Sequence, residues 1–75
     1  MREADRKKFV LLAEKRVTRA RNDIRLVGNL SNRTNYKYTD EDVRKIYRAL
    51  REAVDDMKAR FERRGDERGA SFKLE

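Results

Sequence analysis

Apolar residues recur every three or four positions along two long segments of the chain, with a polar stretch between them. The first segment carries the repeat on Val10, Ala13, Val17, Ala20, Ile24 and Val27. This spacing predicts an amphipathic helix over about residues 3–27. Ala13 and Ala20 are small, so a neighbouring helix could approach closely at those levels. Gly28 comes next, and we expect it to close the helix in the left-handed conformation that glycine adopts most readily.

The second segment has a broad apolar stripe and a clearer start than the first. Thr39 and Asp42 have the spacing of a capping box, which predicts a helix beginning at about residue 40. Tyr38, just before the cap, is placed to pack on Val43 as a hydrophobic staple. The stripe that follows predicts a helix over about residues 40–64. Its candidate association face consists of Val43, Ile46, Tyr47, Leu50, Val54, Met57 and Phe61.

Charged residues and glycines indicate the solvent-facing side and the end of the second predicted helix. Two pairs of opposite charge lie one helical turn apart, Glu41 with Lys45 and Arg51 with Asp55, and each is worth a few tenths of a kcal/mol. Gly65 begins the final stretch GDERGASFKLE, so we predict a flexible C-terminal tail over residues 65–75. The predicted helical hairpin then occupies residues 1–64, with a loop over residues 28–39.

The two predicted helices have matched lengths, which favours an antiparallel hairpin. A stripe on three positions in seven is wider than one neighbouring helix covers. We therefore predict an all-α fold in which a two-helix antiparallel hairpin dimerises into a four-helix bundle, so that the partner is a second copy of this chain. The alternative partner is another helical protein on which the hairpin docks.

Composition limits both the core and the chemistry of the protein. The chain has 75 residues, of which 37% are hydrophobic and 47% charged, and its mean hydropathy is −1.13, so its core is expected to be thin. Histidine and cysteine are both absent, which removes the commonest general base and the preferred zinc ligands. An arginine-lined pocket remains as a catalytic option, but the sequence assigns no residue to it. We predict no enzymatic activity, metal, cofactor or small-molecule substrate.

The net charge of +7 points to a second class of partner. Residues 1–27 hold nine Lys and Arg against four Asp and Glu, and residues 28–39 add Arg33 and Lys37 with no acidic residue. Such a basic half could bind phosphates of a nucleic acid. The cations of the first helix spread around its circumference, which favours weak, non-specific binding over sequence recognition. The candidate nucleic-acid or partner contacts are Arg25, Arg33, Tyr36 and Lys37.

The loop predicted over residues 28–39 is longer than the two to five residues that a helical hairpin requires. Its asparagines suit hydrogen bonds to nearby backbone groups, which would make it an ordered, self-packed loop. Tyr36 lies beside Lys37 and could stack on a base or enter a protein pocket instead. Both interpretations stay open at the level of sequence.

The sequence has no apolar run of signal-peptide or membrane-spanning length, so we expect a soluble, cytoplasmic protein without a membrane partner. A helix lying on a membrane surface fits less well, because alanine fills the centre of the first stripe and tryptophan is absent. The leading functional hypothesis is a small, self-associating helical module for protein interaction or assembly. Nucleic-acid binding through the basic first helix and the loop is the alternative.

Overall fold

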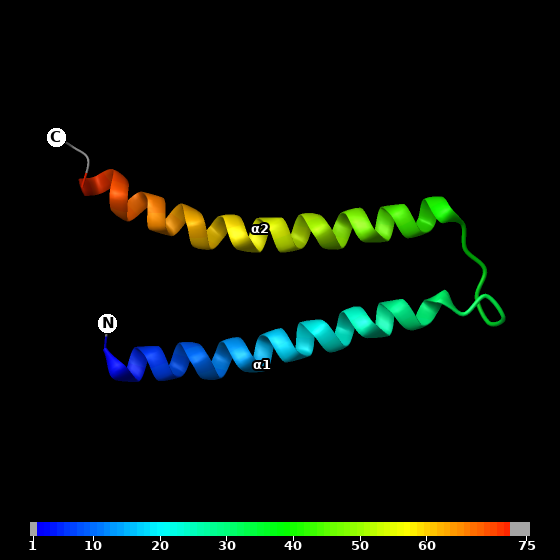
Figure 1. Ribbon diagram of the computed structural model, residues 1–75, viewed down its shortest axis with the longest axis horizontal. Helices are drawn as coiled ribbons and strands as arrows, with labels where there is room; N and C mark the ends of the chain where they lie inside the picture. Colours follow the sequence, from blue (N-terminus) through cyan, green and yellow to red (C-terminus); the bar gives the residue numbers. More distant parts are fainter. Residues whose placement is uncertain (1, 73–75) are drawn as a thin grey trace. The chain divides into compact units, whose positions relative to one another are not determined.

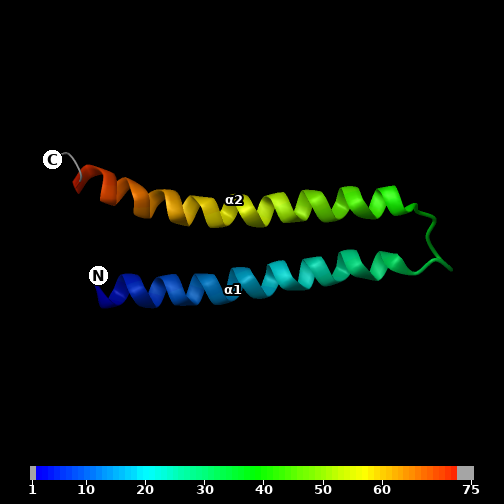
Figure 2. The same cartoon turned by 45° about the horizontal axis from the view of Figure 1, so that its top comes forward.

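The computed structural model describes the backbone of residues 2–72 and the side chains of residues 2–63. Over this range α1 spans Glu3–Gly28, the short 3-10 helix η1 spans Asn29–Ser31, and α2 spans Asp40–Phe72. The backbone described contains no strand, so the predicted all-α class is confirmed. Figures 1 and 2 show α1 and α2 as unbroken helices without a sharp kink. The chain divides into two units, residues 1–37 with α1 and η1, and residues 38–75 with α2.

The start of α1 is stabilised by charge rather than by a capping side chain. Arg2 occupies the N-cap position with extended backbone, and its side chain makes no capping hydrogen bond. The backbone N–H of Arg6 donates to the carbonyl oxygen of Arg2 at 3.0 Å. Glu3 and Asp5 lie in the first turn, where the helix dipole favours negative charge. The helix therefore begins where the apolar periodicity predicts.

The end of α1 differs from the prediction in its backbone geometry. The helix ends at Gly28, within a residue of the predicted position, but Gly28 has φ −60° and ψ −28° and is right-handed. The expected left-handed closure is wrong. Asn29 is right-handed as well, and the carbonyl oxygens of Arg25, Leu26 and Val27 accept backbone N–H groups at this end. The 3-10 turn of η1 tightens the last turn, so no left-handed residue is needed to satisfy these carbonyls.

The start of α2 confirms the predicted capping box. The backbone N–H of Thr39 donates to Asp42 Oδ2 at 2.9 Å, and the backbone N–H of Asp42 donates to Thr39 Oγ1 at 3.1 Å. The Thr39 backbone hydrogen bond is the largest cause that lowers the pKa of the Asp42 carboxyl, because it stabilises the charged form. Tyr38 is half-buried, while its predicted packing on Val43 stays a prediction.

The end of α2 lies beyond the predicted one. The helix was expected to stop at about residue 64, but its backbone continues through Gly65 and Gly69 to Phe72. A glycine inside a helix costs only about 1 kcal/mol, and the chain has no proline to stop the helix. The tail predicted for residues 65–75 is thus helical as far as Phe72, and residues 73–75 lie outside the described residues. The flexibility of this segment stays a prediction.

Burial is low throughout the described side chains. No side chain among residues 2–63 is buried, and the half-buried ones are Val10, Leu12, Ala13, Val27, Tyr38 and Leu50. Large apolar side chains on both helices, such as Ile24 and Phe61, remain more than 40% exposed. The described part of the chain therefore has no closed hydrophobic core, which is unusual for a chain with regular apolar stripes.

Candidate functional site

A continuous apolar surface lies along α2 among the described residues. It is the association face predicted from the sequence, namely Val43, Ile46, Tyr47, Leu50, Val54, Met57 and Phe61. Leu50, at its centre, is half-buried, whereas the other six side chains are 43–64% exposed. Positions three, four and seven apart lie on one side of a helix, so these residues form a continuous stripe. We call this stripe the α2 face.

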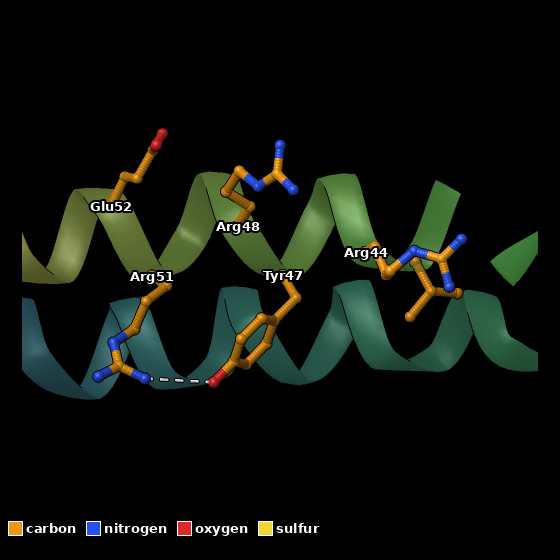
Figure 3. A pocket seen from close by; sticks show the side chains of 6 residues that line it. Arg44, Tyr47, Arg48, Arg51 and Glu52 are labelled. Atoms are coloured by element: carbon orange, nitrogen blue, oxygen red, sulfur yellow. Dashed lines mark hydrogen bonds between the residues drawn. The ribbon is translucent and has the colours of Figure 1, made fainter. Parts of the chain in front are cut away.

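A shallow depression lies at the N-terminal part of the α2 face. It is lined by Val43, Arg44, Tyr47, Arg48, Arg51 and Glu52, all from α2, and most of its lining is apolar. Figure 3 shows Tyr47 and Arg51 pointing to one side of the helix, with Arg48 and Glu52 pointing to another. Arg51 Nη1 donates to the Tyr47 hydroxyl oxygen at 3.2 Å. The hydrogen bond holds the Arg51 guanidinium beside the tyrosine ring, so the α2 face has a cationic border here.

Ion pairs of α2 lie outside the apolar stripe. Arg51 Nε is 3.5 Å from Asp55 Oδ1, which confirms the predicted pair of these residues. Glu41 Oε1 lies 2.9 Å from Arg44 Nη2, while the pair of Glu41 with Lys45 stays a prediction. Residues three apart also face each other on a helix, and the arginine fork reaches this carboxylate directly. All these groups are well exposed, so the pairs keep the helix surface charged and add little stability.

The Tyr47 hydrogen bond is the largest cause that raises the pKa of the Arg51 guanidinium, and the Asp55 charge adds to it. Arginine is protonated throughout the range in which proteins fold, whatever its partners, so the cationic border of the α2 face does not depend on pH. From the sequence, Tyr47 was predicted only as a residue of the apolar face, and its hydrogen bond to Arg51 was not predicted. The four-residue spacing from Tyr47 to Arg51 was the sequence signal that could have identified it.

The second candidate surface follows α1 in the chain and is organised by Asn32. Asn32 Oδ1 accepts the backbone N–H of Thr34 at 2.9 Å. The Asn32 carbonyl oxygen accepts the backbone N–H groups of Asn35 at 3.1 Å and of Tyr36 at 3.0 Å. These three bonds form a turn over residues 32–36. The prediction that loop side chains bond backbone groups is confirmed for Asn32.

The predicted nucleic-acid contacts all belong to the unit of residues 1–37. Arg33, Tyr36 and Lys37 lie in or directly after the Asn32 turn, and the Tyr36 side chain is 49% exposed. Arg25 lies in the last turn of α1, where Arg25 Nη2 donates to Asn22 Oδ1. The turn thus groups three of the four residues, while Arg25 belongs to the helical part of the same unit. We call residues 32–37 the turn segment.

The middle of the α1 stripe carries smaller side chains than the α2 face. Ala13 is half-buried and Ala20 is exposed, both on the stripe predicted from the sequence. At the N-terminal end, the Arg6 guanidinium carbon lies 5.8 Å from the centre of the Phe9 ring, within the range of a cation–π interaction. Phe9 remains 49% exposed with the arginine in this position. Small residues in the middle of α1 leave room for close contact with a helix.

Two other kinds of site, a membrane span and a metal site, are absent from the part of the chain that the structure describes. Within it, neither α1 nor α2 has an apolar stretch long enough to cross a membrane. No three carboxylates of that part come together as a group that could hold a metal ion. Comparisons with protein-family models, with curated proteins and with solved structures find no match to this chain.

Proposed function

We propose that this protein is a small, non-catalytic helical module that assembles with a second copy of itself through the α2 face. The observation that carries the proposal is the exposure of a regular apolar stripe on a helix that has no buried side chain over residues 40–63. A soluble helix rarely leaves such a stripe open to water, because contiguous exposed apolar surface usually marks an interaction site. The absence of histidine and cysteine supports a role without catalysis.

The size of the driving force follows from the exposed fractions. Burying a large apolar side chain completely is worth about 1.5–3 kcal/mol. Six side chains of the α2 face are 43–64% exposed, so roughly half of that value, on the order of 1 kcal/mol each, is still to be gained. Two chains together could therefore gain on the order of 10 kcal/mol before the costs of association, against about 8 kcal/mol for micromolar affinity.

The proposed arrangement is an antiparallel pairing of α1 with α2 and a four-helix bundle of two such hairpins. Ala13 and Ala20 support close packing on α1, where their small side chains allow a neighbouring helix to approach. One helix covers only part of a stripe on three positions in seven, so the width of the α2 face favours a second neighbour. A second copy supplies that neighbour with an identical face and closes the assembly by two-fold symmetry.

The test is the concentration dependence of mass and helicity, measured by analytical ultracentrifugation and circular dichroism. The wild-type protein is expected to be dimeric at micromolar concentration and above. Val54→Asp places a carboxylate in the α2 face and should give a monomer with reduced helicity. Ala59→Asp adds the same charge to the same helix about 140° around from Val54, so it should remain dimeric. A wild-type protein that is monomeric and fully helical at micromolar concentration would refute the proposal.

A poorly helical wild-type monomer would give a different result. It would refute self-association through the α2 face, and docking on another helical protein would then be the arrangement to test.

A further inference from the structure

The net positive charge of this protein comes from the unit that holds α1 and the turn segment. Residues 1–37 contain eleven Lys and Arg and four Asp and Glu, a net charge of 11 − 4 = +7. Residues 38–75 contain ten of each and are neutral. No acidic residue occurs from Ile24 to Thr39, whereas Arg25, Arg33 and Lys37 lie within that stretch. A unit with this excess of cations attracts polyanions.

The turn segment presents its cations and its aromatic ring on an ordered backbone. The Asn32 side chain fixes the Thr34 amide, and the Asn32 carbonyl fixes the amides of Asn35 and Tyr36. Arg33 is thus inside a hydrogen-bonded turn, and Tyr36 is fixed at its end. Ordering a segment before it binds lowers the entropy cost of binding. This arrangement fits a binding surface better than a linker that only joins two helices.

Tyr36 determines which polyanion fits best. Tyr36 is 49% exposed and its backbone amide is fixed, so its exposed side chain can meet a planar group without first unfolding the turn. Aromatic side chains beside cations bind single-stranded nucleic acid, because each unpaired base can stack on the ring while phosphates pair with the cations. The bases of a duplex are stacked on each other and cannot reach an isolated tyrosine in this way. Tyr36 therefore favours single strands over duplexes.

α1 gives no reason to expect groove recognition. Its cations include Lys15, Arg16 and Arg21, which lie roughly 100° or more apart around the helix. A helix that reads a groove concentrates such residues on one side. They can add a general attraction for phosphates around the turn segment. We propose that the turn segment binds single-stranded nucleic acid, with Arg33 and Lys37 on backbone phosphates, Tyr36 stacked on a base, and Asn32 as the positioning residue.

The experiment is a fluorescence-anisotropy titration of the full-length protein with a labelled single-stranded RNA, a single-stranded DNA and a duplex DNA of equal length, at low and near-physiological salt. Binding of either single strand is expected to persist at near-physiological salt and to exceed duplex binding. Tyr36→Ala should weaken it by roughly 5- to 150-fold, the range for loss of one stacked base. Tyr36→Phe keeps the ring and should bind as the wild type does.

Charge and positioning are tested with matched variants. Lys37→Ala should make the log–log slope of affinity against salt shallower by about 0.7, the value for one phosphate contact on a single strand. Lys15→Ala removes the same charge from an exposed site on α1 and should have a smaller effect. Asn32→Ala keeps every cation and the tyrosine, and should weaken binding because the Thr34 amide loses its acceptor. The helicity of each variant is recorded to verify that it folds.

Several results would overturn this proposal. They are binding that disappears at near-physiological salt, duplex affinity equal to single-strand affinity, equal losses for Lys37→Ala and Lys15→Ala, and a Tyr36→Ala variant that binds like the wild type. Sedimentation with anionic vesicles in place of nucleic acid adds another, since binding to vesicles alone would assign the turn segment to membranes. None of these readouts depends on the α2 face, so the outcome is separate from that of the assembly proposal.

Discussion

The substitution Gly28→Ala tests the backbone conformation at the end of α1. The sign of the change in unfolding free energy distinguishes a right-handed from a left-handed Gly28. Gly28 has φ −60° and ψ −28°, values that alanine adopts without strain. A Cβ atom at this position would meet no heavy atom within 4 Å beyond its chain neighbours and the backbone of its own helix. Alanine also reduces the freedom of the unfolded chain, so the substitution should stabilise the protein by about 0.5–1 kcal/mol. In a left-handed conformation it would instead destabilise by about 1–2 kcal/mol.

The assays are urea unfolding and thermal unfolding, both followed by far-ultraviolet circular dichroism. The protein concentration is held fixed, since self-association would make stability concentration-dependent. A gain of this size raises the melting temperature by about 2–8 °C for a chain of this length. A synthetic protein with D-alanine at position 28 is the matched control, because D-residues favour the left-handed region. It should be less stable than the wild type. Stabilisation by D-alanine together with destabilisation by L-alanine would refute the right-handed assignment of Gly28.

Three further predictions concern α2. Thr39→Ala removes the acceptor of the Asp42 amide and should destabilise the helix by about 1 kcal/mol in thermal unfolding, whereas Thr34→Ala, which keeps its backbone bond to Asn32, should not. Because Thr39 lowers the pKa of Asp42, the stability that this carboxylate adds is complete above its unfolded pKa and is lost as the pH falls through the lower folded pKa. Asp42→Asn should abolish that part of the acid dependence of helicity. Tyr47→Phe loses an exposed hydrogen bond and should change stability by less than about 0.5 kcal/mol, so a larger loss would contradict the exposure of this site.

The capping box could be predicted because its geometry depends on residues only three apart. Thr39 and Asp42 form both bonds from local backbone geometry alone, and the same holds for Arg51 with Asp55 and for the Asn32 turn. Local interactions of this kind are specified by residue type and spacing. The apolar periodicity likewise predicted both helices and the position of the α2 face.

The helix ends were harder to predict, because several endings are nearly equal in energy. Gly28 can end a helix in a right-handed or a left-handed backbone conformation. Here it is right-handed, and the 3-10 turn of η1 satisfies the last carbonyl groups of α1. Gly65 and Gly69 cost the helix little, so α2 continued past them. The pairing of Glu41 with Arg44 was equally hard to predict, because residues three and four positions along a helix both lie within reach of a carboxylate.

The short sequence separation of the hydrogen-bonded residues favours fast formation of the helices. Every side-chain hydrogen bond described above joins residues two to four apart. Helical segments held by such bonds form within about a microsecond, and proteins rich in local contacts are among the fastest to fold. If assembly proceeds through the α2 face, the slow step is the meeting of two chains, so the observed refolding rate rises with protein concentration while the early helical phase does not.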